Sequence, residues 1–224
     1  MAQQAIVGWY LFFLGLAAGA TVLAMTAYWA VSPRWLRWWL LASGLFVISR
    51  YVTMTLFATS PDPQPVWGPR RCWFATTLGL TFPSAVALDQ LVRHPAMSPT
   101  KLMRWLSPFF VGYAIVLLFG QMELAPNAIV GMQPHLVGWG RGLLAGTEGF
   151  FVIGFLWVGA QVLNKLSSRR IRVALLGLMI AQGYLGLDGL LVALGLGHHP
   201  FLCSEIFALM AIWCALETAR QGSL

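Results

Sequence analysis

Four ionisable side chains lie inside long apolar stretches of the sequence, where a charge is costly. They are Arg50 in GLFVISRYVTMTLF (44–57), Glu148 in GTEGFF, Asp188 in GLDGLL and Glu205 in CSEIF. An unpaired charge within the hydrocarbon of a bilayer costs at least ~2.5 kcal/mol, so each of these groups needs a partner, water or a ligand. An arginine can pair with a carboxylate, and carboxyl groups can act as proton acceptors. The four residues are therefore the candidates for chemistry.

The composition of the chain predicts an integral membrane protein. Of its 224 residues, 58% are hydrophobic and 9% are charged, and the mean hydropathy is +0.73. A soluble domain carries about 25% charged residues, and several apolar runs here reach the ~20 residues that cross a bilayer. We expect one polytopic transmembrane domain over residues 1–224, in contact with the lipid bilayer. No polar segment is long enough for a soluble domain, so chemistry outside the membrane must belong to other protein subunits.

Breaks rich in proline, glycine and charge divide the chain into seven predicted membrane-spanning helices. They lie near 6–31, 35–58, 72–93, 104–124, 139–164, 171–196 and 200–219. This predicts an all-α, seven-transmembrane-helix bundle. Ten of the fourteen Lys and Arg residues fall on one side, and only Arg70, Arg71 and Arg141 fall on the other. Basic residues mark the cytoplasmic side, so we expect an outer N-terminus and a cytoplasmic C-terminus, in a bacterial cytoplasmic (inner) membrane. The excess of basic residues on the cytoplasmic side thus accounts for the net charge of +7, and no nucleic-acid partner is expected.

The four ionisable residues share one predicted depth in the membrane. At 1.5 Å per residue, Arg50 lies ~6 Å, Glu148 ~5 Å, Asp188 ~6 Å and Glu205 ~7 Å to the outer side of the midplane. An Arg50–acid ion pair that joins two helices would explain one acid but leave two others. Those must be protonated, face water or bind something, which predicts an outer cavity lined by all four residues. We expect Asp188 to be the partner of Arg50. Four polar residues are expected at or near this layer: Thr76, Thr77, Gln121 and Tyr184.

The histidines and known catalytic motifs give little support for intrinsic catalysis. A transmembrane haem needs two axial ligands, usually histidines at matching depth, and no such pair occurs, so intrinsic haem is not expected. His135, His198 and His199 lie in predicted outer loops, where they could ligate a metal or relay protons, although loop histidines without a role are the commoner case. No protease, P-loop or dinucleotide motif is present, and the seventh span has no lysine for a retinal Schiff base.

The first sixty residues or so resemble a known family of membrane anchor subunits. GWYLFFLGLAAGATVLA (8–24) is similar to the opening helix of the NrfD and polysulfide-reductase family, and SPDPQPVWGP is similar to its proline-rich outer loop. The resemblance implies a quinol site near the outer face and docking on iron–sulfur and catalytic subunits. The chain departs from the family at Ser49–Arg50, where an acidic LD is usual, and family members have eight or more spans. No catalytic residue is carried over.

Three functions remain open. The first is a membrane subunit of a respiratory or photosynthetic electron-transfer complex that holds a quinone or pigment in the outer polar layer, where Glu148, Asp188 or Glu205 accepts protons. The second is a transporter or channel for a small cation or protons, using the same acids. The third is a seven-helix sensor that binds a small ligand and signals through a separate partner.

Overall fold

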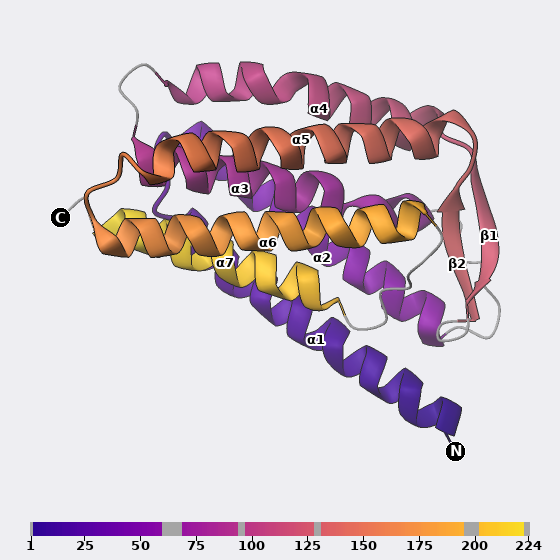
Figure 1. The fold of residues 1–224 in the computed structure, drawn as a ribbon. Helices are drawn as coiled ribbons and strands as arrows, with labels where there is room; N and C mark the ends of the chain where they lie inside the picture. Colours follow the sequence, from indigo (N-terminus) through magenta and orange to yellow (C-terminus); the bar gives the residue numbers. More distant parts are fainter. Residues whose placement is uncertain (1, 60–68, 94–96, 128–130, 195–201, 222–224) are drawn as a thin grey trace.

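The computed structural model describes residues 2–59, 69–93, 97–127, 131–194 and 202–221, and Figure 1 shows them as a helical bundle with a β-hairpin at one end. These residues form seven α-helices, which confirms the expected helical fold class. The helices are α1 (Ala2–Tyr28), α2 (Arg34–Thr59), α3 (Thr76–Val92), α4 (Pro99–Phe119), α5 (Trp139–Leu163), α6 (Arg169–Ala193) and α7 (Cys203–Gln221). A 3-10 helix, η2 (Pro69–Phe74), precedes α3.

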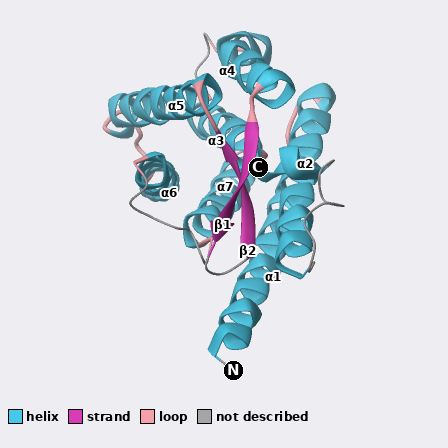
Figure 2. Ribbon diagram, turned by 90° about the vertical axis from the view of Figure 1, so that its right-hand side faces the viewer, coloured by secondary structure: helices cyan, strands magenta, loops and turns pink. Residues whose placement is uncertain are grey.

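The bundle is built around α3. This helix packs against α2, α4, α5, α6 and α7, and α7 in turn packs against α1, α3 and α6. Figure 2 looks toward the hairpin end and shows α3 and α7 in the interior, with α5 and α6 on one side and α1 and α2 on the other. The last helix of the chain therefore lies beside the first.

The outer helices present large apolar side chains to their surroundings. Trp105 is 73% exposed, Phe150 73% and Ile153 71%, whereas consecutive α3 residues such as Val86 and Ala87 are fully buried. Exposed apolar surface on this scale is typical of contact with lipid. Five helices (α1, α2, α4, α5 and α6) are long and apolar enough to cross a membrane by length and composition. These apolar helices indicate a membrane protein.

The two remaining helices are the interior ones, α3 and α7. Helix α3 has only 17 residues, because η2 occupies the chain before Ala75, and α7 contains Glu205, Glu217 and Arg220 among its 19 residues. Both can be short or charged because neighbouring helices, rather than lipid, surround most of their side chains. Length and composition alone therefore single out five of the seven predicted spans.

Helix α4 and the segment after it differ from the expected 104–124 span and outer loop. Ser98 caps α4 by accepting a hydrogen bond from the backbone N–H of Lys101, at 3.3 Å, and Pro99 occupies the first turn, so the helix begins five residues early. It ends at Phe119, and strands β1 (Met122–Asn127) and β2 (Gly131–Leu136) follow as an antiparallel pair. Leu136 of β2 is 6% exposed and packs in a cluster with Tyr113 and Met122, so the hairpin is seated on the bundle.

Candidate functional site

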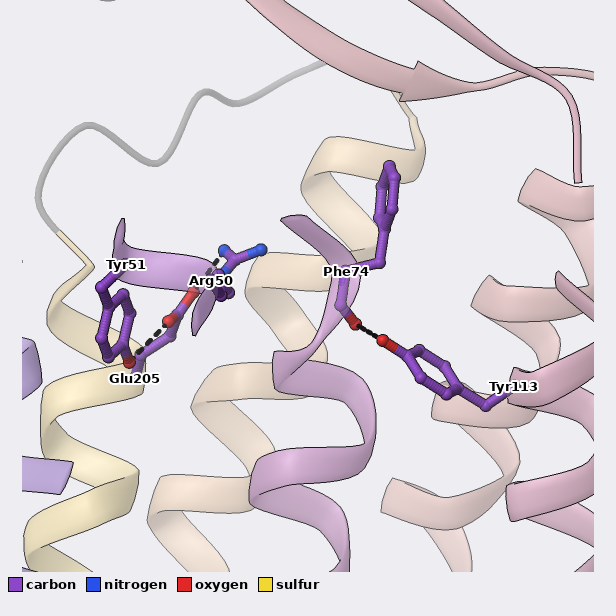
Figure 3. A network of polar contacts seen from close by, with 5 residues as sticks. All are labelled: Arg50, Tyr51, Phe74, Tyr113 and Glu205. Carbon is purple, nitrogen blue, oxygen red and sulfur yellow. Dashed lines mark hydrogen bonds and ion pairs between the residues drawn. The ribbon is translucent and has the colours of Figure 1, made fainter. Parts of the chain in front are cut away.

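Arg50 of α2 and Glu205 of α7 form a buried ion pair. One terminal nitrogen of Arg50 lies 2.7 Å from Glu205 Oε1, and the two side chains are only 11% and 9% exposed (Figure 3). Glu205 lies in the first turn of α7, where the positive end of the helix dipole also favours a carboxylate. The prediction that Asp188 pairs with Arg50 is therefore wrong. Glu205 supplies the carboxylate that Arg50 contacts.

Tyr51, the residue after Arg50, completes the binding of the carboxylate. Its hydroxyl donates a hydrogen bond to Glu205 Oε2 at 3.0 Å, and the tyrosine is 2% exposed. Each oxygen of Glu205 thus accepts a charge-assisted or hydroxyl hydrogen bond from α2, an arrangement stronger than a neutral contact. Tyr10 of α1, 3% exposed, belongs to the same buried cluster as Tyr51. The site therefore joins α1, α2 and α7.

An aromatic side chain of η2 faces the arginine. The central guanidinium carbon of Arg50 lies 6.0 Å from the centroid of the Trp73 ring, within the range of a cation–π contact. Trp73 also packs edge-to-face on Phe57 of α2, with 5.6 Å between ring centroids. The Nε atom of Arg50 is buried and has no hydrogen-bond partner among the residues that the structure describes. A buried donor of this kind is available to an acceptor that is not part of those residues.

A hydrogen bond from α4 holds the residue after Trp73. The Tyr113 hydroxyl donates to the backbone carbonyl of Phe74 at 2.5 Å, and Tyr113 is 3% exposed (Figure 3). This bond ties the end of η2 to α4 just before α3 begins. Tyr113 thus connects α4 to the segment that carries Trp73.

Glu148, one of the other two acids, reaches from α5 to the part of α6 that carries Asp188. Glu148 of α5 is half-buried, and its Oε2 would lie 3.5 Å from a Cβ added at Gly189 of α6. Asp188, also half-buried, is the neighbour of Gly189 in the chain. The polar layer therefore contains two groups: Arg50 with Glu205 between α2 and α7, and Glu148 beside the Asp188 turn between α5 and α6.

The remaining predicted site residues have varied positions. Tyr184 is one turn from Asp188 on α6 and is 41% exposed. Gln121 was expected within the fourth span, but it lies beyond the end of α4. It is exposed, because Gly120 ends the helix before it. Thr76 and Thr77 are the first two residues of α3, and their side chains lie outside the described part of the structure.

The outer-loop histidines are only partly visible. His135 lies in β2, where its Nε2 is 2.6 Å from the side-chain nitrogen of Gln133, while His198 and His199 fall outside the described residues. Within the described ranges, no group of three or more His, Cys, Asp or Glu side chains is placed to hold a metal ion. The proposed metal role of these histidines stays a prediction.

Sequence reasoning missed Tyr51, Trp73 and Tyr113. Nothing in the sequence spacing marks Trp73 as a contact of Arg50 or Tyr113 as a contact of η2. Only Tyr51 had a signal, since it adjoins Arg50 in the chain. Comparison with known proteins adds no assignment: no protein-family model matches the chain, and no curated protein matches it. The geometry of the site is the basis for function.

Proposed function

We propose that the chain is a membrane-embedded subunit of a respiratory or photosynthetic electron-transfer complex and that it holds a quinone beside Arg50. The buried guanidinium carries this proposal. Glu205 binds it, and Tyr51 in turn holds Glu205. Its Nε has no partner among the described residues, and the Trp73 ring centroid lies 6.0 Å from the guanidinium carbon. A quinone is a flat ring bearing carbonyl acceptors, so one arginine donor and one aromatic face match its chemistry.

The proposed topology is a seven-span bundle in a bacterial cytoplasmic membrane, with the N-terminus outside. In support, the basic residues near the α1–α2, α3–α4 and α5–α6 connections and at the end of α7 all lie at the end of the bundle opposite the hairpin (Figure 1). An excess of Lys and Arg marks the cytoplasmic side of a membrane protein. Arg50 and Glu205 would then lie in the outer half of the bilayer.

Each polar residue has a distinct proposed role in quinol oxidation. The reaction converts a quinol to a quinone and releases two protons and two electrons. Arg50 Nε donates a hydrogen bond to a ring oxygen, and Trp73 packs against the ring. Glu148 and Asp188, half-buried between α5 and α6, accept the protons. The electrons pass to a redox centre, a haem or an iron–sulfur cluster, in a partner subunit.

The test is the quinone content of the protein purified in mild detergent from its own membrane. Organic extraction and absorption spectroscopy would compare the wild type with Arg50→Gln/Glu205→Gln, which removes both charges together, and with Trp73→Leu. A charge-assisted hydrogen bond contributes about 1.5–3 kcal/mol, so the double variant should lose quinone affinity roughly tenfold or more. The control is Gln182→Leu/Ser84→Ala, which removes a different buried polar contact, of 2.7 Å, between α6 and α3.

The proposal predicts bound quinone in the wild type and control and its loss in both site variants. Co-purification of other subunits would support the place in a complex. A stable protein that contains no quinone or pigment and no further subunit would contradict the proposal. If the Arg50→Gln/Glu205→Gln protein kept its quinone, Arg50 could not be part of the quinone site.

A proton or small-cation transporter is the second candidate, favoured by the approach of Glu148 to the Asp188 turn. Two half-buried acids on neighbouring helices could pass a cation between them. Proteoliposomes that take up protons or Na⁺, and lose this uptake with Glu148→Gln but not with Glu217→Gln, would support transport. Absence of flux in the wild type would contradict it.

A further inference from the structure

A cavity of about 320 Å³ opens at the basic end of the bundle, where α5 ends and α6 begins. The described residues that line it are two arginines, an amide and apolar side chains, with no acidic residue among them: Leu163, Asn164, Arg169, Arg172, Val173 and Leu176. This cavity lies at the opposite end of the bundle from Arg50. It therefore takes no part in the proposed quinone site.

The arginines of this cavity share one face of α6. Arg169 and Arg172 are three residues apart in the first turn of the helix, so they lie on neighbouring positions of its surface. Both are exposed. The intervening Arg170 is committed elsewhere, because its guanidinium donates to the side chain of Gln221 at the end of α7. Two guanidinium groups with no acid in the cavity lining create a site for a phosphate, which arginine binds through paired N–H groups.

An apolar track continues from the arginines along the same helix. Val173 is 60% exposed, Leu176 41% and Ile180 61%, and their spacing of three and four residues keeps them on one side of α6. From Arg172 to Ile180 the track spans about 12 Å along the helix axis. A charged end followed by an apolar strip is the shape of an amphiphile with an anionic head. A free phosphate would leave the strip unused.

We propose that this cavity binds an anionic phospholipid, with its phosphate held by Arg169 and Arg172 and one acyl chain along Val173, Leu176 and Ile180. Basic pockets between membrane helices bind acidic lipid headgroups in this way. The site provides two positive charges to one phosphate and apolar contact below it. A zwitterionic lipid has the same phosphate but also a quaternary ammonium, which the two arginines repel and no acidic side chain in the described lining balances, so the site should select an acidic lipid with the same acyl chains.

Lipid binding to the purified protein, followed by native mass spectrometry, tests this site. The probes are phosphatidylglycerol and phosphatidylcholine with identical acyl chains. A basic residue near a membrane surface contributes about fivefold to the binding of an acidic lipid, so Arg169→Gln/Arg172→Gln should weaken phosphatidylglycerol binding about 30-fold. Phosphatidylcholine binding should not change. The control is Arg34→Gln/Arg104→Gln, which removes the same charge from exposed positions at the same end but outside the cavity.

A selective loss in the cavity variant, with normal binding by the control, supports the proposal. An equal loss in both variants would overturn it, since general attraction to the basic end would then explain the binding. Competition by soluble glycerol phosphate as strong as that by the lipid would also overturn it, because the site would then bind a free phosphate. If Arg169→Gln/Arg172→Gln does not fold, the affinities of the wild-type protein for phosphatidylglycerol and phosphatidylcholine test the proposal. Equal affinity for the two lipids would overturn it.

Discussion

Replacing Glu205 with glutamine measures how much the buried ion pair stabilises the bundle. The substitution keeps the shape of the side chain and an oxygen that can accept the Tyr51 hydrogen bond, but it removes the negative charge. Arg50 keeps its positive charge at a position where its side chain is only 11% exposed. Removal of one partner of a buried pair costs about 3–5 kcal/mol, because the remaining charge is left uncompensated.

The assay is thermal unfolding of the purified variants in one detergent. A protein of this size loses about 2–4 °C in Tm per kcal/mol, so Glu205→Gln should lower the Tm by roughly 6–20 °C. Arg50→Gln should lower it similarly. The double variant Arg50→Gln/Glu205→Gln should recover much of the loss, since it leaves no unpaired charge in the interior.

The control is a second Arg–Glu pair, which lies entirely within α7, the helix that carries Glu205. Arg220 and Glu217 are 3.6 Å apart, but their side chains are 59% and 25% exposed, so solvent screens the interaction. Glu217→Gln should therefore change the Tm little. A Glu205→Gln protein as stable as the wild type would refute the inference that the pair is desolvated. Losses that simply add in the double variant would show that Arg50 and Glu205 are not energetically coupled.

Two further substitutions test the packing around the site in the same thermal assay. Tyr113→Phe removes the hydrogen bond to the Phe74 carbonyl and should cost about 1 kcal/mol, and an unchanged Tm would argue against this anchor for η2. Gly79→Ala would place a Cβ in steric overlap with Val47 Cγ2 between α3 and α2, so it should destabilise the protein by about 1–3 kcal/mol. Within the described residues, a Cβ added at Gly15 meets nothing within 4 Å beyond its own stretch of α1, so Gly15→Ala should not destabilise the protein. Equal destabilisation by the two alanines would contradict the close α2–α3 contact.

The common depth of the four ionisable residues stays a prediction from the sequence, whereas the partner of Arg50 could not be predicted. Counting residues from the helix ends places Arg50, Glu148, Asp188 and Glu205 at one level, because the rise per residue is fixed. The rotation of each helix about its axis depends on packing with its neighbours. Since α7 packs beside α1 and α3, it turns Glu205 toward α2, and no feature of its own sequence distinguishes this from a turn toward α6.

The limits of α5 follow directly from the sequence, whereas those of α4 do not. The expected span 139–164 agrees with Trp139–Leu163, because polar residues follow it at once. For α4, apolarity was a poorer guide than the Ser98–Pro99 cap, which starts the helix in a polar segment. The hairpin after α4 was missed because its strands contain Pro126 and Pro134, which normally argue against a strand.

The distance along the chain between Arg50 and Glu205 has a consequence for synthesis. The two residues that pair in the folded bundle are separated by 155 positions. At about 5–20 residues per second, the ribosome adds Glu205 roughly 8–30 s after Arg50. During this interval α2 already exists, but the carboxylate that balances its arginine does not. The Arg50–Glu205 bond can therefore form only after α7 has been made and packs beside α1 and α6, so it is among the last contacts available to the bundle.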